Sequence, residues 1–181
     1  MSAQREKEHG YSMEGFAFGL TDGIILVLGI VMGVAEATQD VSLVMISAIV
    51  GGIANALGNS IGFFIAQSTE RGVQIHNLEE HGGKVRVHSS KEVWTSGILS
   101  FGATIVALII LIAPFMFLSL SLALVSTFLL GTIVLFLLGR YVGKISGESQ
   151  LKTGLKYAAL GMVGAVVSYF VGDLLRHLTG V

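Results

Sequence analysis

One carboxylate stands inside an apolar stretch that is long enough to cross a lipid bilayer. Asp22 is the only charged residue between Gly15 and Ala35. A carboxylate at such a depth costs about 2.5–3.5 kcal/mol on insertion-derived scales, so it normally faces a protein interior or a watery path. Asp22 is therefore a candidate for binding a cation or carrying a proton. It could instead be protonated, or cap a helix break beside Gly23, and serve packing only.

Two amides in the next apolar stretch can reach this carboxylate. Asp22 lies seven residues from the start of the first stretch, or about 10 Å deep at 1.5 Å per residue. Asn59 lies seven residues before the end of the second stretch at Ala66, and Asn55 is one turn away on the same face. We expect Asp22, Asn59 and Asn55 to form a polar layer, with the amide oxygens as neutral cation ligands. The two Asn side chains could also simply hold the helices together.

Small residues flank this layer on both stretches. The chain contains 24 glycines and one proline, which suits packed membrane helices better than loops. We expect four of these glycines to let the first two helices approach closely: Gly19, Gly23, Gly58 and Gly62.

A second candidate site lies in the polar connection at 69–93, where His76, Glu79, Glu80 and His81 stand close together. On a helix that extends the second apolar stretch, His76 faces Glu79 and Glu80, a geometry that can hold a metal ion. A solvated, charged helix end explains the same residues without a metal. We expect any metal there to bind weakly, because flexible ligands lose conformational freedom on binding.

The elements that must position these residues are membrane helices. Hydrophobic residues make up 52% of the 181 residues and charged residues 13%, against roughly a quarter in soluble domains. The sequence predicts an all-α integral membrane protein, with an N-terminal segment at 1–14 and a membrane domain at 15–178. Pro114 divides the third helix from the fourth. The five transmembrane helices are expected at 15–35, 41–66, 94–113, 115–138 and 157–175.

The basic residues predict the orientation of these helices. The N-terminal segment carries two Lys or Arg, the 69–93 connection four and the link at 140–156 four, whereas the opposite side has only Arg176. Because basic residues gather in cytosolic loops, we expect the N-terminus in the cytosol and the C-terminus outside. The net charge of −1 indicates no nucleic-acid partner, and the absence of Cys excludes disulfides and thiolate ligands.

An intramembrane enzyme is the least favoured class of function. A pair of catalytic aspartates would have to share a proton, but Asp173 and Asp22 differ in depth by about 14 Å if their helices are unbroken. We expect Asp173 to pair with Arg176 or His177 instead. The sequence also lacks a Ser/His or HExxH arrangement, so we expect neither catalysis nor a tightly bound cofactor.

Several motifs together resemble the vacuolar iron transporter family, from about Gly15 to Gly172. They are Gly19-x-x-Asp22-Gly23 in the first span, Gln67-Ser68-Thr69-Glu70 after an Asn- and Gly-rich second span, Pro114, and Tyr169-x-x-Gly172 in the fifth span. The resemblance implies a five-helix protomer in a homodimer that exchanges divalent iron or manganese for protons along a path at the subunit interface. It also implies that Asp22 handles both the metal and the proton.

The chain departs from that family in the second span and after it. Aligned on Gly62, the family's Met and Glu positions hold Asn59 and Phe63 here. The family's long glutamate-rich cytosolic insertion is replaced by about 25 residues. Loss of a thioether and a carboxylate makes the site harder, which by ligand type suits Mn²⁺, Mg²⁺ or Ca²⁺ better.

The sequence therefore predicts transport of divalent metal cations of the iron or manganese class, Fe²⁺ or Mn²⁺, with or without proton coupling. A non-transporting membrane scaffold or accessory subunit is the alternative. We expect the partners to be membrane lipid, a second copy of the chain and the divalent metal ion. The compact loops favour a prokaryotic plasma membrane over a vacuolar one.

Overall fold

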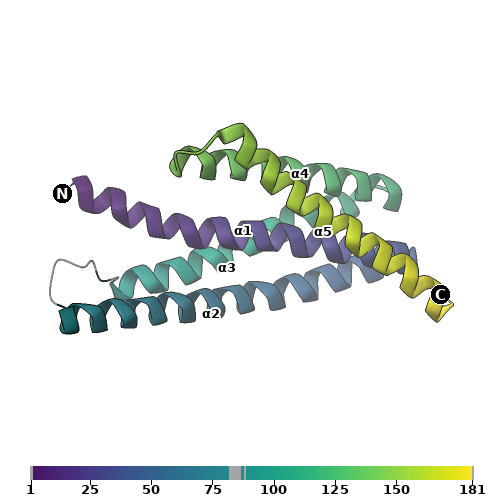
Figure 1. Cartoon of the computed structure of the whole chain (residues 1–181). Helices are drawn as coiled ribbons and strands as arrows, with labels where there is room; N and C mark the ends of the chain where they lie inside the picture. The colour runs from purple at the N-terminus through teal and green to yellow at the C-terminus, as the bar shows by residue number, and fades with distance from the viewer. Residues whose placement is uncertain (1, 82–86, 88, 181) are drawn as a thin grey trace.

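The computed structural model describes residues 2–81, 87 and 89–180, with side chains from Met13 onward except that of His81. Five α-helices in this part of the chain are long and apolar enough to cross a membrane, which confirms the predicted all-α, five-span fold. The termini lie at opposite ends of the bundle (Figure 1), as an odd number of crossings requires. In chain order the elements are α1 (Ser2–Thr38), α2 (Val41–His81), α3 (Ser90–Ile112), a 3₁₀ helix (Ala113–Met116), α4 (Leu120–Ile145) and α5 (Gln150–Thr179).

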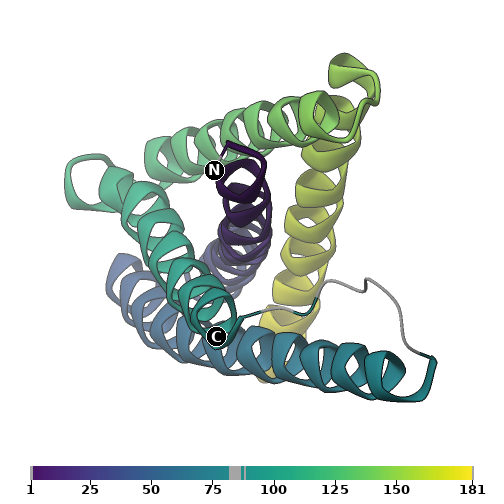
Figure 2. The same cartoon turned by 90° about the vertical axis from the view of Figure 1, so that its left-hand side faces the viewer.

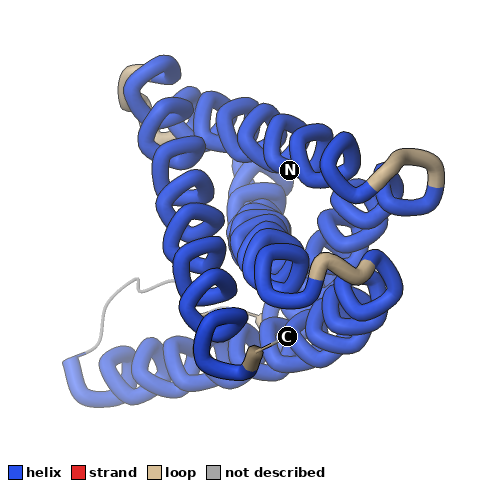
Figure 3. The backbone as a smooth tube through the Cα atoms, turned by 90° about the vertical axis from the view of Figure 1, so that its right-hand side faces the viewer, coloured by secondary structure: helices blue, strands red, loops and turns tan. Residues whose placement is uncertain are grey.

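Helix α1 runs through the middle of the bundle. Figure 2 looks along it from one end, and Figure 3 from the other, and both show the remaining helices arranged around it. It packs against each of the other four α-helices. Its buried residues Ile24, Val27, Leu28 and Val31 recur at the three- and four-residue spacing of a single helix face. The helix that carries Asp22 is thus the core of the bundle.

Small residues bring α1 and α3 into close contact. A methyl group added at Gly19 would overlap the backbone carbonyl of Ser100. Membrane helices have no hydrophobic drive to associate within lipid, so close van der Waals packing of this kind holds them together. Three pairs at four-residue intervals make the contact: Gly15 with Ser96, Gly19 with Ser100, and Gly23 with Thr104.

Hydrogen-bonded caps define where α2 and α3 begin. Asp40 Oδ1 accepts hydrogen bonds from the backbone N–H groups of Ser42 (2.7 Å) and Leu43 (3.2 Å), which caps the start of α2. The chain reaches Asp40 through Gln39, whose φ of 52° lies in the left-handed region. Ser89 and Glu92 form a capping box at the start of α3.

The helices extend beyond the predicted spans at their polar ends. Residues 2–14 continue α1, the predicted connection at 69–93 is helical as far as His81, and the predicted link at 140–156 shrinks to residues 146–149. Apolar runs mark where a helix lies in the membrane, whereas polar residues such as Glu, Lys and Gln continue a helix outside it. The helices are therefore longer than the predicted membrane spans at these ends.

The start of α4 is later than predicted. The fourth span was expected from residue 115, but α4 begins at Leu120. The carbonyl oxygen of Pro114 accepts hydrogen bonds from the N–H groups of Phe117 (3.2 Å) and Leu118 (2.9 Å), which closes a tight turn before the new helix. Pro114 thus ends one helix without directly starting the next.

The fold predicts which positions share a membrane face. The chain has no native cysteine, so single cysteines at Ser89 and Ser149 are expected to react with an impermeant thiol reagent from one side. Cysteines at Gln39 and Ser119 should react only from the other. The excess of basic residues predicts that Ser89 and Ser149 lie in the cytosol. Labelling of Gln39 and Ser89 from the same side would contradict the five-span arrangement.

Candidate functional site

The structure brings the three predicted polar side chains together. Asn55 Nδ2 donates a hydrogen bond to Asp22 Oδ2 at 2.7 Å, and Asn59 Nδ2 donates to the same oxygen at 2.9 Å. The two amides are one turn apart on α2, and the carboxylate comes from α1. The three side chains therefore meet, as counting residues along the two helices predicted.

A third helix joins this layer through Thr104 of α3. Asn59 Nδ2 also lies 3.3 Å from Thr104 Oγ1. The hydroxyl of Thr104 is buried and lies 2.9 Å from the carbonyl oxygen of Gly19 and 3.0 Å from that of Ser100, so it can donate to either. Thr104 was not among the residues predicted for this layer. The sequence feature that could have indicated it is the series of Ser96, Ser100 and Thr104, whose hydroxyl groups recur at four-residue intervals.

The layer directs two hydrogen-bond donors at the Asp22 carboxylate. Both hydrogen bonds to Asp22 are donated by amide N–H groups and reach a single carboxylate oxygen. Asp22, Asn55 and Asn59 are each partly exposed. The carboxylate is therefore hydrogen-bonded within the bundle yet remains accessible from its surface.

The predicted role of the four glycines between α1 and α2 is wrong. Gly19 and Gly23 do pack closely, but against α3. Gly58 and Gly62 are exposed, and a Cβ added at either would meet nothing within 4 Å. The α1–α2 contact at this level includes the hydrogen bonds from Asn55 and Asn59 to Asp22.

The second candidate site consists, in the described residues, of one ion pair. His76 Nε2 lies 3.4 Å from Glu80 Oε1 on the extension of α2, and both side chains are more than half exposed. Among the side chains that the structure describes, no group of three or more His, Asp or Glu residues could hold a metal ion. Glu79 lies on the same exposed extension, and the side chain of His81 is outside the described residues.

Asp173 lies far from Asp22. Its carboxylate Oδ1 is 3.4 Å from His177 Nε2, so the predicted pairing with His177 is confirmed. Gly172 packs against the backbone of Gly33, eleven residues along α1 from Asp22, or about 16 Å away. The other expected partner, Arg176, instead pairs with Glu36 of α1 at 3.4 Å. The two aspartates cannot share a proton.

The fold and the polar layer define an integral membrane protein whose central helix carries a carboxylate supported by two neighbouring helices. A model of the VIT family matches residues 14–93 and 72–173, and the chain belongs to that family. It is similar to an uncharacterized protein of Methanocaldococcus jannaschii, with 28% identity over 162 residues that cover 84% of each chain. It is also similar to vacuolar iron transporter homolog 1 of Arabidopsis thaliana, with 28% identity over 91 residues, covering 47% of this chain and 46% of that protein.

Proposed function

We propose that the chain carries divalent metal cations of the iron or manganese class across the membrane, with Asp22 as the binding carboxylate. The observation that carries this proposal is the Asp22 carboxylate inside the bundle, held by Asn55 and Asn59. Membership of the VIT family and similarity to a vacuolar iron transporter homolog support metal-ion transport in general. The metal is a substrate here, and the proposal needs no tightly bound cofactor.

A bound cation would take the position beside the Asp22 carboxylate that the two amide N–H groups now occupy. Both amides now turn Nδ2 toward Asp22 Oδ2, and rotating each amide group would present its carbonyl oxygen instead. Asp22 with two amide oxygens is an all-oxygen ligand set, which suits hard cations such as Mn²⁺. A proton on Asp22 after metal release would neutralise the empty site, which would couple metal movement to proton movement.

A homodimer would cover the exposed side of this site. Gly62 follows Asn59 by three residues and so neighbours it on the surface of α2, and Gly58 lies one turn before Gly62 on the same face. Small residues at four-residue intervals let two membrane helices approach closely. We therefore propose a metal path beside a subunit interface, with lipid around the remaining surface. Four exposed small residues stand at four-residue intervals along this face of α2: Ala54, Gly58, Gly62 and Ala66.

A membrane scaffold or accessory subunit is the second candidate, and Phe63 favours it. This residue stands where the family has a carboxylate. Its ring packs against that of Phe18 of α1, with the ring centroids 5.5 Å apart. A contact between two aromatic rings packs the helices together but supplies no oxygen ligand for a hard cation. The two candidates therefore differ in whether the remaining carboxylate, Asp22, is sufficient for transport.

A prokaryotic plasma membrane is the proposed location. The connections at 39–40 and 146–149 are short, and an archaeal protein is similar over 84% of its length. Both observations suit a compact prokaryotic membrane protein.

Metal flux into liposomes tests the proposed function. The purified protein is reconstituted and exposed to Fe²⁺, Mn²⁺, Mg²⁺ and Ca²⁺ in turn, with and without a pH gradient. We expect Fe²⁺ or Mn²⁺ uptake above that of protein-free liposomes, and the dependence on the gradient to report proton coupling. Absence of uptake for all four metals, with the protein shown to be folded and inserted, would favour the scaffold.

A further inference from the structure

An apolar cavity of about 340 Å³ lies where α1, α4 and α5 meet. Of the nine described residues that line it, Glu36 and Tyr169 carry oxygen-bearing side chains, whereas the other seven are apolar and come from all three helices, among them Met32, Phe128 and Ala165. Pockets that bind small ligands are typically of this size, with a mostly apolar lining and a few polar groups.

The polar groups of this cavity lie near the membrane surface. Glu36 is two residues before the end of α1 at Thr38, and Leu124, which also lines the cavity, is four residues from the start of α4. Both helix ends are on the side of the membrane opposite the 69–93 connection. Tyr side chains concentrate at the level of lipid headgroups. The apolar part of the cavity therefore extends from the headgroup level toward the middle of the bilayer.

The cavity is open on the outer surface of the bundle. Val125, Leu129 and Val166 line it, yet they are 59%, 53% and 48% exposed. All three lie in segments that are long and apolar enough to cross a membrane. They belong to α4 and α5, whereas the proposed subunit interface is on α2. An acyl chain of the surrounding lipid can therefore enter the cavity from the side.

The Glu36 carboxylate supplies a hydrogen-bond acceptor at the polar end. It is hydrogen-bonded by the Tyr169 hydroxyl and pairs with Arg176 at 3.4 Å, and its side chain is 15% exposed. Two carboxylate oxygens offer about four acceptor positions, so they can accept from a further donor. Asp173 adds a second negative charge near Tyr169, against the one positive charge of Arg176. With His177 neutral, this balance favours a cationic donor, which also makes the stronger hydrogen bond.

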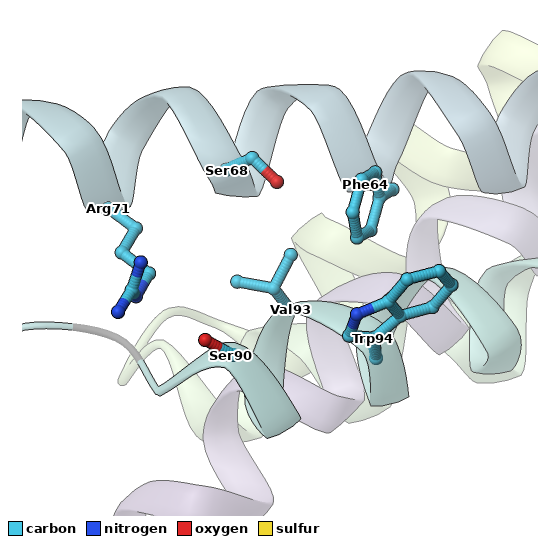
Figure 4. A pocket seen from close by; sticks show the side chains of 6 residues that line it. All are labelled: Phe64, Ser68, Arg71, Ser90, Val93 and Trp94. Carbon is cyan, nitrogen blue, oxygen red and sulfur yellow. The ribbon is translucent and has the colours of Figure 1, made fainter.

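A second cavity, between α2 and α3, is less suited to an acyl chain. Figure 4 shows Arg71 at one end of it and the rings of Phe64 and Trp94 at the other. Its volume is about 130 Å³, and the hydroxyls of Ser68 and Ser90 also line it. This cavity is smaller and more polar, and it lies near the opposite membrane surface.

We propose that the cavity between α1, α4 and α5 holds one acyl chain of a membrane lipid whose headgroup ammonium, as in phosphatidylethanolamine, donates a hydrogen bond to Glu36. The lipid belongs to the leaflet opposite the 69–93 connection. Asp22 lies fourteen residues from Glu36 along α1, or about 21 Å away. The proposal therefore stands whether or not the chain transports metal.

Two lipids with equal chains and equal net charge test the headgroup contact. Binding of dioleoyl phosphatidylethanolamine and dioleoyl phosphatidylcholine to the full chain in detergent is measured by native mass spectrometry. Choline is cationic but has no N–H group to donate. We expect phosphatidylethanolamine to bind about tenfold more tightly, the contribution of one hydrogen bond to a charged group. Equal affinities, or tighter binding of dioleoyl phosphatidylglycerol than of phosphatidylethanolamine, would overturn the proposal.

Replacing Glu36 by Gln tests the residue assigned to the ammonium group. We expect Glu36→Gln to bind the two zwitterionic lipids with similar affinity, because the charge-assisted hydrogen bond is lost. Asp40→Asn is the matched control, since it removes a carboxylate at the same membrane surface that does not line the cavity. It should keep the tenfold preference. A preference that persists in Glu36→Gln, or an equal loss in Asp40→Asn, would contradict the assignment.

A second pair of variants tests the cavity itself and keeps the proposal falsifiable if Glu36→Gln does not fold. Val166→Phe adds a ring at a half-exposed position that lines the cavity, whereas Val167→Phe adds one at an exposed position beside it. We expect Val166→Phe alone to weaken phosphatidylethanolamine binding, about tenfold or more, because several methylene groups of the chain would leave the cavity. Equal affinities of these two variants would show that the acyl chain binds elsewhere.

Discussion

Replacing Asp22 by Asn is expected to reduce metal flux to the level of protein-free liposomes while the protein still folds and inserts. The new side chain has the same size, and its amide oxygen can still accept the hydrogen bonds that Asn55 and Asn59 now donate to the carboxylate. It lacks the negative charge that would hold a divalent cation and the proton that would replace it. Loss of a contact to a charged group costs up to about 3 kcal/mol, which predicts a loss of flux of about a hundredfold.

The measurement is metal uptake with an internal pH dye, on wild type and variant reconstituted at equal density. Asp40→Asn is the matched control, because it removes a carboxylate on an exposed turn and Asn caps a helix as well as Asp does. It should transport like the wild type. Normal flux in Asp22→Asn would remove Asp22 from the mechanism. Metal flux that survives without proton movement would leave Asp22 as the proton site alone.

Replacing Gly19 by Ala is expected to destabilise the protomer by about 1–3 kcal/mol, the usual cost of forcing atoms into a filled contact. The added methyl group would overlap the backbone carbonyl of Ser100, which cannot move aside as a flexible side chain could. The same change disturbs the carbonyl oxygen of Gly19, which lies within hydrogen-bonding distance of Thr104 Oγ1. Since Thr104 also contacts Asn59, we expect the polar layer to shift as well.

Thermal unfolding in detergent measures this loss of stability. Gly102→Ala is the matched control, because Gly102 lies on α3 and a Cβ there would meet nothing within 4 Å. We expect its midpoint to be unchanged or slightly raised, since Ala favours a helix more than Gly does. Equal midpoints for Gly19→Ala and Gly102→Ala would show that the contact between α1 and α3 tolerates a methyl group.

The number of spans and the common level of the polar residues could be predicted, because both depend only on the distance along the helix axis. A bilayer has a fixed thickness and a helix a fixed rise per residue, so an apolar run gives a span and a residue count gives a depth. That reasoning gave the common level of Asp22, Asn55 and Asn59, and it separated Asp173 from Asp22. The helix ends outside the membrane could not be found in this way.

The sequence could not predict which helices pack against one another. The depth of a residue in the membrane does not say toward which neighbouring helix its side chain points. Gly19 and Gly58 lie in similar small-residue patterns, yet the first packs against α3 and the second faces open space. Thr104 was overlooked for the same reason. A hydroxyl can bond to the carbonyl of its own helix, so its sequence alone does not indicate that it reaches a neighbouring one.

The central position of α1 has a consequence for how the protein is made. Helix α1 leaves the ribosome before the four helices that surround it in the finished bundle. Until α2 emerges, Asp22 has neither of its amide partners, and the surface around Gly33 stays uncovered until α5, which carries Gly172, has been synthesised. A nascent chain that stalls before α5 would therefore present an incomplete core to the insertion machinery and to membrane quality-control proteases. The packing around α1 is thus complete only after α5 has been synthesised.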